Sequence, residues 1–434
     1  MQSSVLCFFK ILGDRMKYIH RDIEDLIKKA RNTFKTVLVT GARQTGKSTL
    51  LEKLFPEQRM ISFDDSFLEE QAKNDPEFFL SLYETPLTLD EIQYVPSLFR
   101  NIKMKVDRSN NKGEYLFTGS QPFKLMDMAA ESLAGRVYVA ELPPLSMREI
   151  QQSEFKKPFI PTRKYVQSRK NSAKRPGNLW EMIHRGGYPE LQNKEVDWQM
   201  FFSGYVKTYL ERDVRALAVV HNLDDFRRFM IACAARTGQM VNYSNIADEI
   251  SRDVSTVKRW MSILESSGII YLLEPYSSNA LKRAIKAPKL YFRDTGLACY
   301  LTRWLTPETL ANGNMSGNMF ETYVISEILK SYSNAGIDYR YCVSYYRGKD
   351  KLRHAEGTNI RETEAEIDFI IEENGILYPI EIKKTEAPKA DMTKAFRVLD
   401  NLKDKKRGCG AVICTCASPG VLRDNVLAIP AWYV

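Results

Sequence analysis

Short apolar runs recur through the first 150 residues of the chain. The runs TVLVT (36–40), PLTLDE (86–91), EYLFTGSQ (114–121) and VYVAEL (137–142) have the length of buried parallel strands. TLLEKLF (49–55), which follows the first run, is typical of a helix. This pattern predicts an α/β domain over residues 1–152.

The middle of the chain changes pattern twice. Residues 153–178 hold eight Lys or Arg against one acid, with three prolines. We expect a basic linker, most simply a solvated connector, with a segment that follows a phosphate backbone as the alternative. Apolar spacing predicts a helical lid over 179–238. Residues 239–300 have the order of a winged helix-turn-helix, whose expected buried helix faces are Ile246, Ala247, Ile250 and Val257, Trp260, Met261, Leu264.

The last part, residues 301–434, is predicted to be a further α/β domain. NMFETYVISEILKSY (318–332) fits an amphipathic helix with Phe320, Val324, Ile328 and Leu329 inward. In EIDFIIEENGILYPIEIKK (366–384) two apolar runs flank Asn374-Gly375, the strongest short hairpin signal. A two-residue turn there pairs Glu373 with Ile376 and makes Asp368 the cross-strand partner of Glu381.

Composition narrows the class of protein. The 434 residues are 44% hydrophobic and 27% charged, as expected of a globular chain of about three domains. The net charge of +9 favours anionic partners, nucleic acid before membrane. No run resembles a membrane span or a cleaved leader. Seven cysteines without CxxC spacing fit a reducing cytoplasm rather than a disulfide framework, and four histidines make structural zinc an unsuitable assignment.

The segment after the first strand has the spacing GxxxxGK[ST] of a P-loop. Its glycines let backbone amides wrap phosphate oxygens, Lys47 reaches the β and γ phosphates of ATP, and Ser48 offers its hydroxyl to Mg²⁺. A chance loop is the alternative, but strand, loop and helix follow in the required order. The residues expected to contact the nucleotide are Gly41, Ala42, Arg43, Gln44, Thr45, Gly46, Lys47, Ser48 and Thr49.

Polar groups at the ends of later strands supply the remaining parts of such a site. Asp90 can hold the magnesium shell and Glu91 can polarise the attacking water, unless both merely begin a solvated loop. Ser120, with Gln121 beside it, can sense the γ-phosphate or orient water. Arg136 can stabilise transferring phosphate in its own or a neighbouring subunit, or can form a surface ion pair.

Four segments, GARQTGKST, LTLDE, FTGSQ and SLAGRVYVAELPPLS, resemble the prokaryotic AAA-family ATPases. GGYPEL (186–191), YLERDV (209–214) and YFRDTGL (291–297) resemble the uncharacterised C-terminal region that accompanies that ATPase domain in one widespread group. The similarity runs from about Met16 onward, and residues 1–15 precede it. It implies an ASCE-type P-loop core in which the catalytic Glu91 follows the Walker B Asp90.

Nucleic-acid contacts are expected from the winged helix. Lys258 and Arg259 fall on the exposed face of the second helix, and Lys282 and Arg283 lie in the connection between the wing strands. Such cations suit DNA phosphates. A winged helix attached to an ATPase can equally serve as a packing or partner surface.

The acidic hairpin invites a chemical interpretation because like charges facing each other repel unless a cation joins them. A helix, a strand with Asp368 and a strand with Glu381-x-Lys383 resemble, in this order, the PD-(D/E)xK nuclease fold, which is restriction-endonuclease-like. The resemblance implies that Asp368 and Glu381 hold Mg²⁺, that Lys383 positions or activates the hydrolytic water and that Glu321 supports the metal. The same register also places Glu366 opposite Lys383, so a plain ion pair is the alternative.

Together these patterns predict an ATP-binding and ATP-hydrolysing protein of the cytoplasm that acts on DNA, with its nucleotide state coupled to a winged helix and a nuclease-like domain. A non-cleaving regulatory switch, in which ATP controls association with a protein or nucleic-acid partner, is the alternative.

Overall fold

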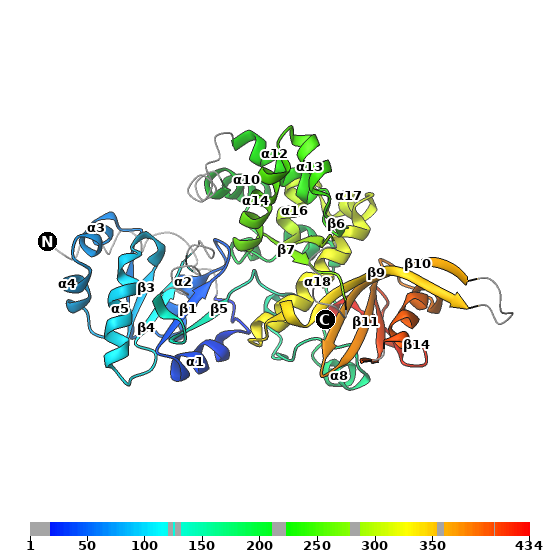
Figure 1. Cartoon of the computed structure of the whole chain (residues 1–434), viewed down its shortest axis with the longest axis horizontal. Coiled ribbons are helices and arrows are strands. Elements are labelled where there is room, and N and C mark those ends of the chain that lie inside the picture. Colours follow the sequence, from blue (N-terminus) through cyan, green and yellow to red (C-terminus); the bar gives the residue numbers. More distant parts are fainter. Residues whose placement is uncertain are drawn as a thin grey trace.

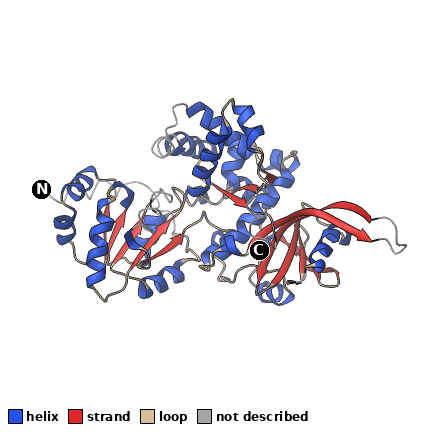
Figure 2. Ribbon diagram, in the orientation of Figure 1, coloured by secondary structure: helices blue, strands red, loops and turns tan. Residues whose placement is uncertain are grey.

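The computed structural model describes residues 18–119, 125, 132–210, 223–277, 287–353, 360–402 and 404–434. Within these residues three β-sheets follow one another along the chain, each with helices around it (Figures 1 and 2). The first has five strands, the second three and the third seven.

The first sheet is parallel throughout, with the strand order β2-β3-β4-β1-β5. Its strands are β1 (Thr36–Thr40), β2 (Arg59–Ser62), β3 (Leu87–Asp90), β4 (Tyr115–Thr118) and β5 (Val137–Glu141). The surrounding helices are α1 (Glu24–Thr33), α2 (Lys47–Leu54), α3 (Ser66–Asn74), α4 (Pro76–Ser81), η1 (Ile92–Tyr94), α5 (Ser97–Arg108) and α7 (Met147–Ile150).

Both faces of this sheet are buried. Leu38 belongs to one apolar core, whereas its neighbours Val37 and Val39 belong to another on the opposite face. This is why the run TVLVT is apolar without alternation, and the predicted α/β domain around a parallel sheet is confirmed.

The middle of the chain is mainly helical. Its elements are α8 (Arg163–Arg169), α9 (Leu179–Arg185), η2 (Glu190–Gln192), α10 (Trp198–Tyr205), the π-helix η3 (Val206–Leu210), α12 (Leu223–Ala234), β6 (Gln239–Met240), α13 (Tyr243–Ile250), α14 (Val254–Ser266), β7 (Ile270–Leu273), β8 (Lys289–Phe292) and α16 (Thr295–Leu301). Strand β8 is the centre of a small antiparallel sheet, between β6 and β7.

Helices α13 and α14 bury the faces that the sequence predicts, at Ile246, Ala247 and Ile250 and at Val257, Trp260, Met261 and Leu264. The turn between them is built locally. Ser251 ends α13 in the left-handed region, and the Asp253 side chain caps α14 by accepting from the backbone N–H of Thr256 at 2.8 Å.

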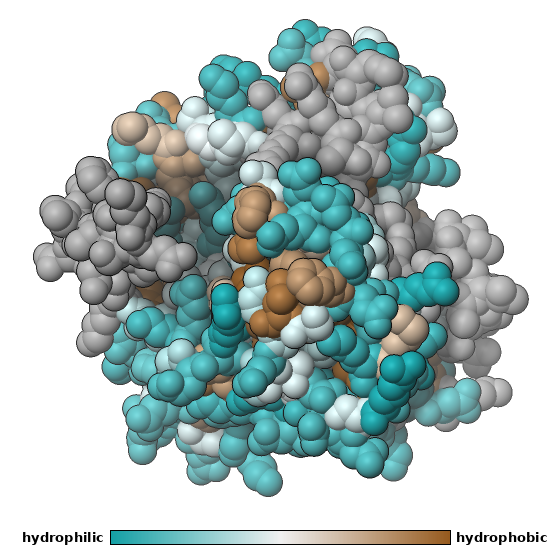
Figure 3. Space-filling view, turned by 90° about the vertical axis from the view of Figure 1, so that its left-hand side faces the viewer, coloured by the Kyte–Doolittle hydropathy of each residue, from teal (hydrophilic) through white to brown (hydrophobic). Residues whose placement is uncertain are grey.

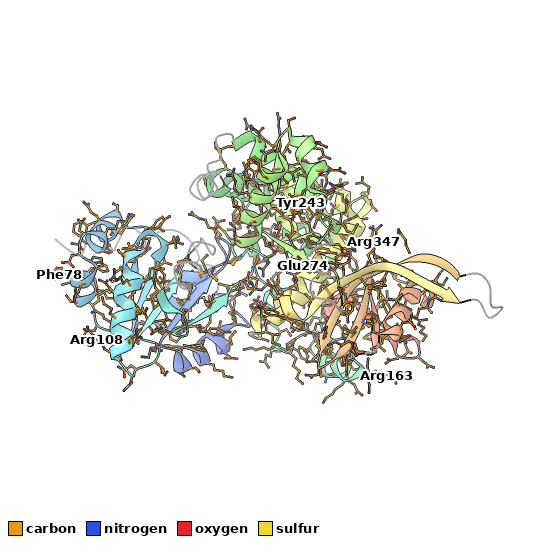
Figure 4. The ribbon with its side chains drawn as sticks, in the orientation of Figure 1. Phe78, Arg108, Arg163, Tyr243, Glu274 and Arg347 are labelled. Atoms are coloured by element: carbon orange, nitrogen blue, oxygen red, sulfur yellow. The ribbon has the colours of Figure 1, made fainter. Side chains whose placement is uncertain are left out.

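Residues 153–178 differ from the expected solvated connector. Phe159, Tyr165 and Arg169 are buried, and the hydroxyl of Tyr165 donates to the carbonyl of Tyr433 at 3.0 Å. Helix α8 therefore packs beside the C-terminal sheet, where Figure 4 labels its first residue, Arg163. The many lysines and arginines favoured a solvated segment, although three of its side chains are buried and fix it against the rest of the protein.

The third sheet is mixed, with the order β14-β15-β13-β11-β10-β9 and β12 paired to β11. Its part of the chain contains α17 (Pro307–Asn312), α18 (Ser316–Asn334), η4 (Tyr339–Tyr341), β9 (Val343–Arg353), β10 (Ile360–Glu373), β11 (Ile376–Ile382), η5 (Ala390–Asn401), β12 (Lys406–Arg407), β13 (Gly410–Cys414), β14 (Gly420–Arg423), β15 (Val426–Pro430) and η6 (Ala431–Tyr433). Strands β9 and β10 extend beyond the sheet as a long arm (Figure 2).

Helix α18 is buried on its polar side as well as on its apolar side. Phe320, Val324, Ile328 and Leu329 point inward as predicted, but Glu327 and Lys330 are buried too. The carboxylate of Glu327 accepts from the backbone N–H of Met147 at 2.7 Å, and the ammonium of Lys330 donates to the carbonyl of Leu145 at 3.0 Å. The helix is therefore a central element between the first domain and the rest, rather than an amphipathic surface helix.

The face of the molecule on which α3 and α4 lie is mostly hydrophilic, with several smaller apolar areas (Figure 3). The exposed apolar residues of these helices are Phe67 and Phe78, the latter labelled in Figure 4, and Leu82 follows directly after α4. Among the residues described above, no helix combines the length and the apolar character needed to cross a membrane.

Candidate functional site

The loop between β1 and α2 has the backbone of a phosphate-binding loop. Gly41, Gln44 and Gly46 have φ of 142°, 57° and 89°. A Cβ on Gly41 would lie 2.3 Å from the carbonyl oxygen of Leu142, so only glycine fits there. The loop leads directly into the N-terminus of α2, where backbone amides are not used within the helix.

Hydroxyl groups surround Asp90 at the carboxyl end of β3. Its Oδ1 accepts from Ser48 Oγ at 2.7 Å and from Thr118 Oγ1, and its Oδ2 accepts from Ser62 Oγ at 3.1 Å. The parallel sheet thus brings Ser48 and Asp90, which are far apart in the sequence, into direct contact. A hydroxyl and a carboxylate are the hard oxygen ligands that Mg²⁺ accepts beside nucleotide phosphates.

Lys47 is buried at the base of the loop. Its ammonium donates to the carbonyls of Gly41 at 3.1 Å and Ala42 at 2.9 Å. Phosphate oxygens placed over the loop would compete for this ammonium with these two neutral acceptors.

Glu91 lies in the same pocket as the P-loop. Its φ of 54° puts it in the left-handed region, which turns the chain sharply at the end of β3. The pocket has a volume of about 290 Å³ and is lined by Arg43, Gln44, Gly46, Lys47, Ser48, Thr49, Asp64, Glu91, Tyr205 and Thr208.

Two residues of this lining come from the middle of the chain and were missed by the sequence reasoning. Tyr205 ends α10, and Thr208 lies in the π-helix that follows. Gly268, in the turn before β7, also lies near the P-loop, because a Cβ added there would be 3.6 Å from the backbone nitrogen of Ala42. Only the unusual density of aromatic residues around 198–209 hinted at such a role.

Arg136 is not brought to this pocket within its own chain. Arg136 directly precedes β5 and so lies at the amino-terminal ends of the parallel strands. The P-loop follows the carboxyl end of β1, at the opposite end of the sheet. The guanidinium of Arg136 pairs with the carboxylate of Asp107, which is the surface ion pair given above as the alternative. A role at the phosphate of a neighbouring subunit stays a prediction. Ser120 and Gln121 lie outside the described residues.

The predicted hairpin register around Asn374-Gly375 is confirmed. The β10–β11 ladder runs from Glu373–Ile376 to Phe369–Ile380, and both turn residues have positive φ. Asp368 and Glu381 follow one position beyond the last of these pairs.

Lys383 joins the two acids. Its Nζ lies 3.0 Å from Asp368 Oδ2 and 3.0 Å from Glu381 Oε1. Asp368 Oδ2 also accepts from the backbone N–H of Ile382 at 2.9 Å. The other oxygen of Glu381, Oε2, is buried and accepts no hydrogen bond from the described residues. We refer to Glu321, Glu366, Asp368, Glu381 and Lys383 as the acidic site.

Glu321 reaches the acidic site from α18, and its negative charge contributes to the raised pKa of Glu381. Burial and the nearby Asp368 raise the pKa of Glu381 to about 8 and that of Glu321 to about 7. Burial alone would lower the pKa of Lys383, but Asp368 and Glu381 hold it above its ordinary value. The site therefore favours protons or other cations.

Within the described part of the chain, Glu366 pairs with Lys289, at 2.6 Å, rather than with Lys383 as the alternative ion pair requires. No group of three or more His, Cys, Asp or Glu side chains among these residues is arranged to hold a metal ion. The donor set still fits Mg²⁺, because it offers carboxylate oxygens only and includes the buried Glu381 Oε2 that lacks a donor.

Of the four cations expected to contact DNA, the structure places two. Lys258 and Arg259 are exposed on α14, and the ammonium of Lys258 lies 5.7 Å from the ring centroid of Tyr243, which Figure 4 labels. Lys282 and Arg283 lie outside the described residues.

Comparison with known families divides the chain into three parts. Residues 33–151 match a family described as AAA domain, residues 177–308 match Domain of unknown function (DUF8612) and residues 316–434 match Domain of unknown function (DUF4143). The first part is therefore similar to AAA domains, and it is followed by regions that match two further families.

Similar sequences include uncharacterized protein Rv2008c of Mycobacterium tuberculosis and uncharacterized protein Mb2031c of Mycobacterium bovis. Each is 28% identical over 414 residues, which cover 95% of this chain and 83% of the relative.

Similar solved structures include the Walker-type ATPase PABY2304 of Pyrococcus abyssi, with a TM-score of 0.44 and 14% identity over 67% of this chain and 99% of that one. A single-residue variant of RuvB from Thermotoga maritima has a TM-score of 0.28 and 15% identity over 58% of this chain and 86% of that one. AMPPCP-bound DnaA from Aquifex aeolicus has a TM-score of 0.25 and 15% identity over 56% and 85%.

Proposed function

We propose that the P-loop pocket binds ATP with Mg²⁺ and hydrolyses it, with the nucleotide state transmitted to the middle domain. The contact between Ser48 and Asp90 at 2.7 Å, in a pocket that also contains Glu91, carries this proposal. Magnesium, when bound with the nucleotide, would neutralise charge on the β and γ phosphates. Ser48 and Asp90 are the residues that would hold it.

The protein's own groups have separate tasks in this reaction. The loop amides and Lys47 bind the phosphates, and Glu91 orients a water molecule and accepts its proton. Tyr205 and Thr208 close one side of the pocket. Because these two residues and Gly268 belong to the middle domain, a change at the phosphates reaches that domain directly.

Binding and hydrolysis measured separately test the proposal. We expect Lys47→Ala to lose ATP binding, and Glu91→Gln to bind ATP normally while hydrolysing it at least about 100-fold more slowly. Glu84→Gln, an exposed acid of the same domain, serves as the matched control and keeps full activity. Unchanged hydrolysis in Glu91→Gln would remove Glu91 from the mechanism.

A second candidate function is metal-dependent cleavage of DNA at the acidic site, in a domain of the PD-(D/E)xK type. The observation that favours it is the convergence of Asp368, Glu381 and Lys383, together with a buried Glu381 oxygen that accepts no hydrogen bond from the described residues. Asp368, Glu381 and Glu321 are the residues that would hold Mg²⁺, and the ion would acidify a water molecule and stabilise the pentavalent phosphate. Lys383 lies beside both acids, where it would position that water.

Plasmid nicking separates this function from the alternative switch. We expect Mg²⁺-dependent nicking that disappears in Lys383→Ala and survives in Lys47→Ala. If no form of DNA is cut with any divalent metal, the acidic site is not a nuclease, and a non-cleaving ATP-dependent switch becomes the better account.

We further propose that α13, α14 and the strands β7 and β8 act as a winged helix on DNA. Lys258 and Arg259 project from the exposed face of α14. We expect the double variant Lys258→Ala/Arg259→Ala to weaken DNA binding and reduce its salt dependence. Arg227→Ala/Arg228→Ala removes the same charge from the exposed face of α12 and is the matched control. Equal loss in both variants would point to net charge alone.

A further inference from the structure

Lys289 of the middle domain lies inside the acidic site of the C-terminal domain. It is the first residue of β8 and is only 4% exposed. Its Nζ lies 2.6 Å from Glu366 Oε1, 3.8 Å from Glu321 Oε1 and 4.0 Å from Asp368 Oδ1. A lysine is seldom buried to this degree without a specific set of partners.

The same strand supplies a second donor. Tyr291 follows Lys289 by two residues, so both side chains leave the same face of β8. The hydroxyl of Tyr291 donates to Glu321 Oε1 at 2.6 Å. Strand β8 therefore places the ammonium of Lys289 and the hydroxyl of Tyr291 against acids of strand β10 and helix α18.

Asp368 shows how the two lysines divide the site. Its Oδ1 faces Lys289, whereas its Oδ2 accepts from Lys383. Lys289 thus occupies the side of Asp368 that also faces Glu321 and Glu366. Glu381 lies on the other side with Lys383, and only there is a buried carboxylate oxygen left without a hydrogen-bond donor among the described residues.

The charges of the site agree with this division. Glu321, Glu366, Asp368 and Glu381 bring four negative charges when ionised, and Lys289 and Lys383 bring two positive charges. The remaining two negative charges match one divalent cation. Without Lys289, three carboxylates would face one another across the space that its ammonium fills, and their repulsion would favour a second ion there.

We propose that Lys289 is a fixed counter-cation and positioning residue of the acidic site, contributed by the middle domain, and that it limits the site to one divalent cation. This inference rests on the proposed metal-dependent function of the acidic site. Lys289 holds Glu321, Glu366 and Asp368 in place from outside the C-terminal domain, so the site is complete only when β8 is docked against it.

Counting bound Mn²⁺ in the full-length, nucleotide-free protein by electron paramagnetic resonance tests the proposal. The ions that belong to the site are those lost in Asp368→Asn. We expect one ion in the wild type, two in Lys289→Met and one in Lys289→Arg, which keeps the charge. Lys406→Met, an exposed lysine on β12 of the same large sheet, is the matched control and keeps one ion.

The outcomes distinguish the existence of the metal site from the role of Lys289 in it. One ion in both the wild type and Lys289→Met, with equal affinity, or two ions in the wild type, overturns the role of Lys289 and leaves the metal site standing. No ion in either protein overturns the metal site and the inference together. Ion binding in Lys289→Met alone also overturns both, because the wild-type site would then hold no ion.

A second variant covers the case in which Lys289→Met does not fold. Glu366 is partly exposed, and its removal frees Lys289 to pair more closely with Glu321 and Asp368. We expect Glu366→Gln to weaken Mn²⁺ binding by about tenfold, because the lysine then competes more strongly with the ion. Unchanged Mn²⁺ affinity in Glu366→Gln would overturn the proposal.

Discussion

Arg293, the residue directly after β8, forms an ion pair with Glu141, the last residue of β5. Strand β8 therefore touches the P-loop domain at one end and, through Lys289, the acidic site at the other. At roughly 3.3 Å per residue, the two contacts are about 13 Å apart along one strand. Two candidate sites that belong to different domains are thus joined by a single short element.

This relationship predicts a large effect of breaking the pair. Arg293 is buried, whereas the Glu141 side chain is 37% exposed and also accepts from the hydroxyl of Tyr339 at 3.3 Å. Arg293→Met should therefore lower the free energy of unfolding by about 2 kcal/mol, the loss expected for a hydrogen bond to a charged group. Urea denaturation measures the change. Arg136→Met breaks the exposed pair with Asp107 and is the control, for which we expect little effect. Similar losses in both variants would show that the β8 contact is no stronger than a surface pair.

The lining of the nucleotide pocket predicts that the middle domain affects ATP affinity. Thr208→Glu places a negative charge beside the phosphate-binding loop and should weaken ATP binding by about tenfold, with partial recovery at high salt. Thr208→Gln has nearly the same shape without the charge and should bind ATP as the wild type does. Isothermal titration of both variants measures the difference, and equal affinities would place residue 208 away from the bound phosphates.

The raised pKa of Glu381 predicts how stability depends on pH in the metal-free protein. Below about pH 4.5 this carboxyl is protonated in both states; between about 4.5 and 8 only the folded state keeps the proton. The free energy of unfolding should therefore fall as pH rises through this range, by up to about 1.4 kcal/mol per unit, and then level off. Urea titrations from pH 5 to 9 with chelator present measure the slope.

Glu381→Gln cannot release this proton, so it should flatten that slope. Adding Mg²⁺ to the wild type should restore stability at pH 8 and above, because the cation then replaces the proton. Identical slopes in the wild type and in Glu381→Gln would show that the carboxyl titrates near its ordinary value.

The backbone conformation of Gly186 predicts that replacing this glycine lowers stability. Its φ is 79°, and a Cβ there would lie 2.5 Å from Asp294 Oδ1. The other oxygen of Asp294 accepts from the N–H of Gly187 at 2.7 Å, so a hydrogen bond joins the segments GGYPEL and YFRDTGL. Gly186→Ala should cost about 2 kcal/mol or more of stability. Gly177→Ala, which has open space around it, is the control, and thermal unfolding compares the two.

The parts of the fold that can be predicted from the sequence depend on local chemistry. Asn374-Gly375 dictates its own turn, and the turn dictates the register that brings Asp368 near Glu381. The P-loop and the buried faces of α13 and α14 likewise follow from spacing within about fifteen residues.

The parts that cannot be predicted in this way depend on contacts between distant segments. The local pattern places Lys289 in a wing strand, and nothing in its neighbourhood reveals that acids from residues 321 to 368 surround it. The polar residues of α18 resemble a solvent-facing side until the P-loop domain covers them. Periodicity reports that a residue has a polar environment or an apolar one, but not which part of the chain provides it.

Most of α18 is buried, on its polar side as well as on its apolar side, and this has a consequence for proteolysis. Because one helix supplies surface to the P-loop domain through Glu327 and Lys330 and also carries Glu321 to the acidic site, a cut on either side of it would leave both halves with exposed, unmatched surface. Limited proteolysis should therefore release no stably folded fragment that ends near this helix.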